Sequence, residues 1–361
     1  MIEVLPADDA TVAVAVDALR RGRLVAFPTE TVYGLGADAM NLDAVASVYG
    51  LKGRPTDHPL IVHLPAAADV WRWADVEMQS TRGIAADSID SLTAQLWPGP
   101  LTLVLWARPE VPRAVTGGQD TVALRVPGND VALDLLRGFG GGVVAPSANR
   151  FGRVSPTAAA HVVAEFGGAD VDVLVLDGGA TRLGLESTVV DLTTSHPRLL
   201  RPGSLPLSVV EAIVSGGSQS ASPADRRGSG RTRSRGADRA ATPRAPGTLA
   251  KHYAPATPLR LVATARLASP PADAAVIARF QKPPGSAVRA GGTHAPWVVL
   301  PTDAPGFARG LYAAIRELDD AGASVILVEE PPSGDEWLAV RDRLERAAAA
   351  HAVGHGDTGG H

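Results

Sequence analysis

Two cations flank a glycine in the run Lys52-Gly53-Arg54-Pro55, where residue types and spacing could together do chemistry. The run follows a helical apolar pattern and precedes a strand-like one, which predicts a turn. Cations with free backbone between them suit a polyphosphate or a carboxylate ligand. A solvated surface turn gives the same pattern, so this motif alone does not identify a site.

Short hydrogen-bonding side chains follow further strand-like runs. Ser147 and Asn149 come just after a short apolar run, and ligands collect at strand ends in α/β sheets. Glu186, Ser187 and Thr188 stand at the start of another such run. Each group is either ordinary capping chemistry or a set of groups presented to a ligand.

A glycine-rich stretch resembles a dinucleotide fingerprint without meeting its context. Residues 34–39 read Gly-Leu-Gly-Ala-Asp-Ala, and Asp57 lies at about the right distance. The fingerprint needs a strand running into the first glycine and a helix opening at the last. Polar residues 28–31 interrupt the strand, and the helix signal begins only at Asn41. We therefore predict a glycine turn, and no P-loop pattern occurs.

Other catalytic classes are excluded by composition and spacing. The chain has no cysteine, which excludes disulfides, thiolate catalysis and cysteine-based metal sites. His58 and His63 stand five residues apart on a strand-like run, which predicts opposite faces and no shared zinc. The Gly-x-Ser-x-Gly pattern is missing. A metal site in the three-histidine tail 351–361 is less favoured than a frayed end.

The chain must position these residues with short strands and helices. It has 361 residues, 45% of them apolar, which predicts about two domains with real cores. We expect helices and strands to succeed one another irregularly up to about residue 210. The expected helices are 9–21, 41–49, 130–137 and 157–166, and the strands are 24–27, 59–64, 101–106, 121–126, 143–145, 171–176 and 187–192.

A second, smaller unit follows a linker. Strand patterns at 259–262, 275–277, 297–300 and 325–328 alternate with helical patterns at 307–320 and 336–350, which predicts a parallel, Rossmann-like sheet. The predicted organisation is a domain 1–210, a flexible Arg/Ser/Gly-rich linker and lid 211–255, a domain 256–350 and a disordered tail 351–361.

The linker composition leaves two interpretations open. Residues 215–246 contain seven Arg, two Asp and no large apolar side chain, so they cannot offset their ordering entropy by burial. They form either a solvated linker or a basic arm that touches RNA. The whole chain has a formal net charge of −4 and 4% aromatic residues, which disfavours a nucleic-acid-binding protein. Its first residues show no secretory pattern and no apolar run reaches a membrane span, so we expect a cytoplasmic protein without membrane contact.

The separate signals occur together in one known family. The chain resembles the two-domain YrdC-like threonylcarbamoyl-AMP synthases over about residues 5–350. Single motifs are weak, but so many in order are specific. The matching segments are 28–36, 52–55, 59–63, 97–102, 125–127, 145–149, 155–157, 186–189, 200–203, 246–247 and 252–255.

The resemblance implies a fold and a reaction. The fold is a YrdC-like twisted mixed-sheet domain followed by a smaller Rossmann-like α/β domain. The enzyme is a nucleotidyltransferase that converts L-threonine, bicarbonate and ATP into L-threonylcarbamoyladenylate and pyrophosphate. A tRNA threonylcarbamoyl-transferase complex then uses this product to form N6-threonylcarbamoyladenosine beside the anticodon, and direct tRNA binding is weak or absent. The implied cofactor is Mg²⁺ with ATP, held mainly through the phosphates rather than by a protein metal site.

The resemblance also implies residue roles, and these agree with the physical reading. The nucleophile is the carbamate oxygen of the substrate, so the protein must mainly position groups and neutralise charge. The implied catalytic residues are Lys52 and Arg54. The implied ATP-binding residues are Arg54, His58, Ser147, Asn149, Ser155, Arg201 and Tyr253, and the implied threonine-binding residues are Thr31, His63, Arg125 and Ser187.

Several points stay open at this stage. His58 stands where the family often has Asn. Tyr253 is either the anchor of a lid that closes over the nucleotide or a packing residue of the second domain. A module that binds double-stranded RNA or tRNA, and a carbamoyltransferase, are the alternative functions. The overall acidity speaks against the first, and the absence of acylphosphatase or cysteine-based zinc-finger units speaks against the second.

Overall fold

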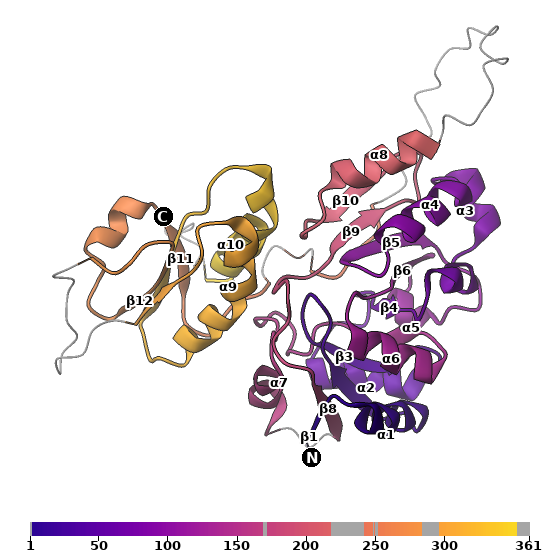
Figure 1. Ribbon diagram of the computed structural model, residues 1–361, viewed down its shortest axis with the longest axis horizontal. Helices are drawn as coiled ribbons and strands as arrows, with labels where there is room; N and C mark the ends of the chain where they lie inside the picture. Colours follow the sequence, from indigo (N-terminus) through magenta and orange to yellow (C-terminus); the bar gives the residue numbers. More distant parts are fainter. Residues whose placement is uncertain are drawn as a thin grey trace, which may run out of the picture.

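The computed structural model describes residues 2–168, 172–217, 242–247, 249, 252–283 and 296–351. Within these residues the chain forms two units that lie side by side, each built on its own sheet (Figure 1). The first is a ten-stranded mixed sheet and the second is a four-stranded parallel sheet. This confirms the predicted fold class.

The large sheet has the strand order β1-β8-β2-β3-β7-β4-β6-β5-β9-β10. The sheet combines parallel pairs such as β4 with β6 and antiparallel pairs such as β5 with β6. The strands are β1 (Ile2–Pro6), β2 (Leu24–Phe27), β3 (Gly34–Asp38), β4 (Ile61–His63), β5 (Leu101–Trp106), β6 (Thr121–Arg125), β7 (Val143–Val144), β8 (Val173–Asp177), β9 (Thr188–Asp191) and β10 (Arg198–Arg201).

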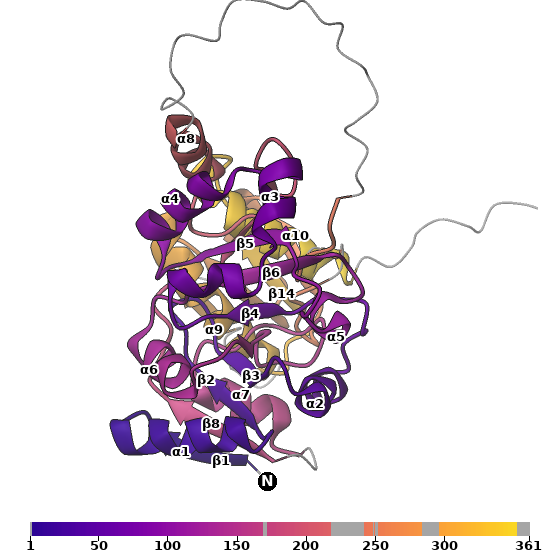
Figure 2. The same cartoon turned by 90° about the vertical axis from the view of Figure 1, so that its right-hand side faces the viewer.

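Helices cover both faces of this sheet, because its central strands are apolar on both sides. Val25 and Phe27 of β2 pack in a cluster with α1 and α6, while Leu24 and Ala26 pack in a second cluster that includes α2. Figure 2 shows α1 beside β1 at one end of the unit and α4 and α8 at the other. The helices are α1 (Asp9–Arg20), α2 (Leu42–Lys52), α3 (Val76–Arg82), α4 (Ala86–Leu96), α5 (Arg113–Thr116), α6 (Asp130–Phe139), α7 (Ala159–Phe166) and α8 (Leu207–Gly217).

Capping fixes the helix that presents the Lys-Gly-Arg turn. The Asn41 side chain accepts hydrogen bonds from the amides of Asp43 and Ala44, at 3.1 and 3.2 Å, which confirms the predicted cap. The helix ends at Gly53, whose φ of 60° lies in the left-handed region that favours glycine. Helix α6 is capped by Asn129 and begins at Asp130, so the prediction of Asp130 as the cap was one residue late.

The predicted glycine turn at residues 34–39 is wrong, because Gly34–Asp38 forms strand β3, paired antiparallel to β2 and β7. The glycines permit close approach rather than a turn. A Cβ atom on Gly36 would lie 2.7 Å from Cε1 of Phe27 and 2.9 Å from the carbonyl oxygen of Val25. The sequence patterns also missed β1, α3, α4, α5, β10 and α8.

The second unit has the strand order β11-β14-β12-β13, and every pair is parallel, as predicted. Its apolar helix faces pack on one side of the sheet, and this cluster also contains Val32, Val154 and Tyr253 from outside the unit. The core of the second unit therefore continues onto the first. The elements are β11 (Leu259–Val262), β12 (Ala274–Ala278), β13 (Trp297–Val299), α9 (Ala304–Asp319), β14 (Val325–Glu329) and α10 (Leu338–Ala349).

The domain limits proposed from the sequence stay predictions. Helix α8 runs from Leu207 to Gly217, across the proposed limit at 210. Most of the proposed linker and lid, and the tail beyond His351, lie outside the described residues. None of the helices in the described ranges combines the length and apolarity that crossing a bilayer requires.

Replacing Gly36 with Ala should destabilise the protein by about 1–3 kcal/mol, because the paired strand must move to admit the methyl group. Urea unfolding measures this loss. The matched control is Gly50→Ala in α2, where a Cβ meets nothing within 4 Å and helix propensity improves. Equal stabilities for the two variants would contradict the close approach at β3.

Candidate functional site

A pocket opens where strand ends of the large sheet meet the chain that leads into the second unit. Its walls come from residues 29–34, from residues 145–147, from residues 186–187 just before β9 and from Gly247, His252 and Tyr253. The predicted residues that line it are Thr31, Arg54, His63, Arg125, Ser147, Ser187, Arg201 and Tyr253.

The turn at residues 29–32 places Thr31 in the pocket. The Thr29 hydroxyl donates to the carbonyl of Val32 at 2.7 Å and accepts from the amides of Thr31 and Val32. Such local side-chain to backbone bonds stabilise a turn instead of a continued strand. The hydroxyls of Thr29 and Thr31 lie 2.8 Å apart, hydrogen-bonded to each other. The polar interruption of the strand is thus what builds this wall.

Arg125 lies at the end of β6 and binds this turn. Its Nη1 donates to the Thr31 hydroxyl at 3.0 Å, its Nε donates to the carbonyl of Gly99 at 3.2 Å, and its Nη2 lies 2.7 Å from Oε1 of Glu30. Both charged side chains are nearly inaccessible to water, so each requires the other. Glu30 was not among the predicted site residues, although a carboxylate inside an otherwise uncharged run was its available signal.

Arg201 joins β9 to the segment that closes the pocket. Its Nη2 and Nε donate to the hydroxyl and carbonyl of Ser187, both at 3.1 Å, and its Nη1 donates to the carbonyl of Pro246 at 3.0 Å. The hydroxyls of Ser187 and Thr102 are hydrogen-bonded at 2.8 Å. At Gly247 a Cβ atom would overlap the Tyr253 hydroxyl, so only glycine fits there. The backbone register shifts between Leu199 and Arg201, a bulge that re-aims the arginine.

Lys52 lies behind the pocket wall rather than in it. Its Nζ donates to the carbonyl of Ser147 at 2.5 Å and to the carbonyl of Asn149. Complete burial, with the nearby Arg54 charge, holds the pKa of Lys52 well below its ordinary value. The Asn149 side chain donates to the carbonyls of Arg150 and Arg153 at 2.7 and 2.9 Å. Lys52 and Asn149 therefore fix the turn that presents Ser147.

Arg54 enters the pocket from the predicted turn. Its Nη2 donates to the carbonyl of Pro59 at 2.8 Å, and its guanidinium lies 5.6 Å from the centre of the Phe151 ring. Burial lowers the pKa of Arg54 to about 10, which leaves the side chain charged at neutral pH. The His58 ring packs edge-on against Phe151 and does not line the pocket. Strand β4 begins only at Ile61, so the prediction that His58 and His63 share a strand was wrong.

Aromatic rings continue from this point to the second unit. His252 packs edge-on between Phe151 and Tyr253, with centroids at 5.7 and 4.1 Å, and Tyr253 stacks on Tyr312 of α9 at 6.0 Å. Tyr253 is buried and has a φ of 62°, a strained conformation for a side chain of this size. Packing therefore fixes Tyr253 in an unfavourable backbone conformation where it faces the pocket.

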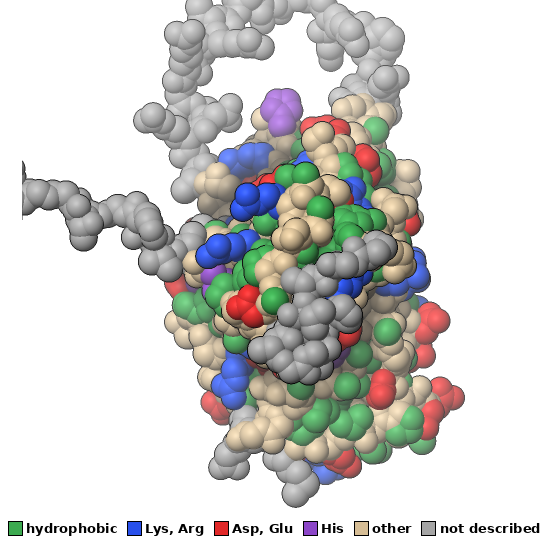
Figure 3. All heavy atoms as spheres, turned by 90° about the vertical axis from the view of Figure 1, so that its left-hand side faces the viewer, with side chains coloured by type: hydrophobic (Ala, Val, Ile, Leu, Met, Phe, Trp, Pro, Cys, Tyr) green, Lys and Arg blue, Asp and Glu red, His purple; other side chains and the backbone are tan. Residues whose placement is uncertain are grey.

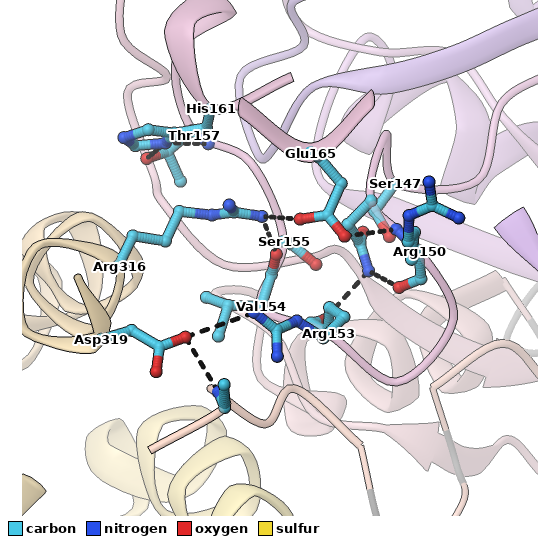
Figure 4. Close-up of polar contacts among 12 residues, drawn as sticks. Ser147, Arg150, Arg153, Val154, Ser155, Thr157, His161, Glu165, Arg316 and Asp319 are labelled. Carbon is cyan, nitrogen blue, oxygen red and sulfur yellow. Dashed lines mark hydrogen bonds and ion pairs between the residues drawn. The ribbon is translucent and has the colours of Figure 1, made fainter. Parts of the chain in front are cut away.

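Helix α9 also holds the loop that precedes Ser155 (Figure 4). Arg316 donates to the carbonyl of Val154 and, at 3.1 Å, to Glu165, which accepts from the Arg150 amide at 3.0 Å. The next turn of α9 carries Asp319, 3.3 Å from Arg153. Ser155 itself is fully buried and donates to Glu186, so like Asn149 it lies outside the pocket lining.

The chemistry of this pocket is that of an anion-binding site. Three guanidinium groups line it, those of Arg54, Arg125 and Arg201. Among the described residues no histidine is hydrogen-bonded to the hydroxyl of Ser147 or Ser187, so neither is arranged as an activated nucleophile. Within the same residues no group of three or more His, Cys, Asp or Glu is placed to hold a metal ion. The arrangement suits binding and charge neutralisation.

Buried neutral histidines should make stability depend on pH. Burial, with the Arg125 charge, lowers the pKa of His63 to about 3, and burial lowers that of His252 to about 3 as well. The ordinary value is 6.5, so between these pH values the unfolded chain binds more protons and the free energy of unfolding falls as pH falls. Each histidine contributes up to about 1.4 kcal/mol per pH unit, measurable by urea unfolding.

His63→Asn should lower the slope of the free energy of unfolding against pH by the contribution of about one proton, because the variant has no imidazole at this position. The matched change at exposed His196 should leave the slope as it is in the wild type. If His63→Asn keeps the full slope, the imidazole is not buried in its neutral form.

Comparison with known proteins finds the same two-part organisation. The family model described as "Telomere recombination" matches residues 17–203, and that described as "Threonylcarbamoyl-AMP synthase, C-terminal domain" matches residues 209–349. The threonylcarbamoyl-AMP synthase of Pyrococcus abyssi is 38% identical over 345 residues, which cover 95% of either chain. That of Bacillus subtilis is 36% identical over 362 residues, covering 97% of this chain and 96% of the other.

A solved structure agrees over nearly the whole chain. The crystal structure of P. abyssi Sua5 complexed with L-threonine superposes with a TM-score of 0.77 at 33% sequence identity. The match covers 97% of this chain and 98% of that one.

Proposed function

This chain belongs to the two-domain threonylcarbamoyl-AMP synthase family, and from that premise we propose that its pocket holds ATP and L-threonine together. The protein is a nucleotidyl-transferring enzyme that makes L-threonylcarbamoyladenylate, the first step of tRNA N6-threonylcarbamoyladenosine formation. The observation that carries the proposed site is the set of three guanidinium groups converging on one pocket. A polyphosphate and an amino-acid carboxylate are the anions that such a pocket suits.

In the proposed reaction, the threonine nitrogen first forms a bond to the carbon of bicarbonate, a carbon–oxygen bond of bicarbonate breaks, and water leaves with the proton that the nitrogen gives up. A carbamate oxygen then forms a bond to the α-phosphorus of ATP, and the bond from that phosphorus to the β-phosphate bridging oxygen breaks. Pyrophosphate leaves with the electron pair. The protein supplies no nucleophile in this sequence, and it contributes orientation and charge neutralisation instead.

For threonine we propose Thr31, His63, Arg125 and Ser187. The contact between Arg125 and Thr31 supports this assignment, because it puts a carboxylate-binding guanidinium beside a hydroxyl. His63 lines the same pocket, and its Nδ1 atom is buried without a hydrogen-bond partner in the described part of the chain. An unpaired buried polar atom is what a polar ligand would satisfy.

For ATP we propose contacts from Arg54, Ser147, Arg201 and Tyr253, which line the pocket. Asn149 and Ser155 lie behind the wall, and we propose that they shape it; His58 is proposed to act through its packing on Phe151. Arg54 is proposed to offset phosphate charge from the pocket lining. Lys52 is proposed to contribute to this indirectly, by holding the turn that presents Ser147.

Mg²⁺ is proposed to enter with the ATP phosphates. Glu186 is the one carboxylate-bearing residue among the described residues lining the pocket, and both its oxygens already accept hydrogen bonds. This donor set fits an ion carried mainly by phosphate oxygens and water rather than by a protein cage. When bound, the ion would neutralise developing charge on the phosphates.

The product is proposed to pass to a tRNA threonylcarbamoyl-transferase complex in the cytoplasm, with weak or no direct contact between this protein and tRNA. On the face of the second unit shown in Figure 3, basic, acidic and hydrophobic side chains are interspersed rather than gathered into one basic block. A direct tRNA-binding surface would carry clustered positive charge.

The direct test mixes the protein with ATP, L-threonine and labelled bicarbonate. A labelled adenylate and one pyrophosphate per adenylate are expected. Retention on tRNA without ATP consumption would contradict the proposal and favour a binding module.

Arg54→Ala and Lys52→Ala should each slow pyrophosphate release by about 10²-fold, on the order of 3 kcal/mol of transition-state stabilisation. Arg137→Ala on the exposed face of α6 serves as the control and should retain the wild-type rate. Near-normal pyrophosphate release by Lys52→Ala would remove that residue from the proposed machinery.

Substrate analogues test whether the threonine hydroxyl is bound. A site built to hydrogen-bond a hydroxyl rejects an analogue lacking it, because its own polar groups stay unpaired. Serine should react weakly and 2-aminobutyrate more weakly still, as measured by kcat/KM for adenylate formation. Equal values for threonine and 2-aminobutyrate would show that the hydroxyl is not recognised.

A further inference from the structure

Glu186 is held by side chains of the second unit. Its Oε1 accepts from the Ser155 hydroxyl at 2.5 Å, while its Oε2 accepts from the Tyr312 hydroxyl at 3.0 Å and from Nε of Arg343 at 2.9 Å. Tyr312 belongs to α9 and Arg343 to α10. A carboxylate in the wall of the active-site pocket thus takes two of its three hydrogen bonds from helices of the other unit.

Arg343 makes contacts in several directions at once. Its side chain is 1% exposed, its Nη2 donates to the carbonyl of Pro202 at 2.9 Å, and its Nη1 lies 2.5 Å from Oδ2 of Asp342. Its guanidinium carbon lies 5.0 Å from the centre of the Tyr253 ring. The planar fork of an arginine can make these contacts together, whereas a lysine ammonium cannot.

The groups that face Glu186 keep it ionised. Burial by itself would raise its pKa, but the charges of Arg343 on α10 and Arg201 on β10, with the Ser155 hydrogen bond, hold the pKa at about 2. Tyr312 has a pKa well above its ordinary value because of burial and the Glu186 charge, so it remains a donor. His252 and Tyr253, which also lie within the influence of Glu186, are uncharged at neutral pH.

We propose that Arg343 is a positioning residue of the active site, supplied by the second unit, which orients the Glu186 carboxylate against Ser155 in the wall of the nucleotide and threonine pocket. The inference rests on the proposed function of that pocket. It gives the second unit a defined part in the reaction, because a guanidinium from α10 is hydrogen-bonded to Glu186 in the pocket wall.

The test compares Arg343→Gln with the wild type in the full chain, through kcat and KM for ATP and for threonine at several pH values. Loss of the guanidinium lets the Glu186 pKa rise by about 1–3 units or more, so the carboxylate takes up a proton on the acid side. We expect kcat to fall by about 10- to 100-fold. We also expect the ratio of variant to wild-type rate to fall further as the pH is lowered from about 6 to about 4, because a rise of about 1–3 units from about 2 places the Glu186 pKa at about 3–5. Arg343→Lys keeps the positive charge, so its pH profile should be closer to that of the wild type than its kcat is.

Two further variants separate positioning from simple loss of structure. Tyr312→Phe removes one hydrogen bond to Glu186 while keeping the ring, and it should give a smaller loss in the same direction. In a Glu186→Gln background, Arg343→Gln should add no pH dependence, because the two residues act as one unit. Arg309→Gln, an exposed change on α9, is the matched control and should keep wild-type rates.

Arg343→Gln with an unchanged pH profile, or with the same fold-loss in the Glu186→Gln background, would overturn the proposal. A wild-type protein that forms no adenylate would instead count against the proposed function. The two failures are distinguished by calorimetric binding of L-threonine and of a non-hydrolysable ATP analogue. The affinities of Arg343→Gln for both ligands should fall as the pH is lowered, relative to those of the wild type. This outcome is expected even if the wild type forms no adenylate.

Discussion

Guanidinium groups buried away from water must each find oxygen partners, and the site is organised around this requirement. Arg125 takes Glu30, Thr31 and the carbonyl of Gly99, while Arg201 takes Ser187 and the carbonyl of Pro246. Burying such a charge is costly unless it is paired and hydrogen-bonded. Because the partners come from distant parts of the chain, satisfying each arginine also brings the walls of the pocket together.

The contacts between the second unit and the first meet the same requirement for oxygen partners. Its helices contribute Arg343, Arg316 and Asp319 to the first unit, and its apolar core continues across the boundary through Tyr253. Arg343, Arg316 and Asp319 each make hydrogen bonds across this boundary. The two units are therefore joined by interactions that reach the pocket wall, because Glu186 is hydrogen-bonded directly to side chains of α9 and α10.

Sequence patterns predicted what depends on neighbours along the chain. The Asn41 cap, the apolar strand 24–27 and the parallel second sheet follow from local periodicity and capping. Strand β3 was not predicted because its glycines have a low strand propensity, and the strand is stabilised by its pairing with β2 and β7. Glu186 was recognised only as part of the group 186–188, and its carboxylate was given no role, because its partner Arg343 is 157 positions away and spacing cannot reveal that pairing.

The bulge in β10 has a second effect, on how the molecule meets copies of itself. β10 is an outer strand of the ten-stranded sheet, and an outer strand offers unpaired backbone groups to any passing chain. Here the register breaks before Arg201, prolines stand on either side of the strand, and Arg198 carries a charge paired with Asp191. The register shift before Arg201, which lines the pocket, therefore also makes this edge strand less able to pair with a strand of another molecule and so opposes edge-to-edge aggregation.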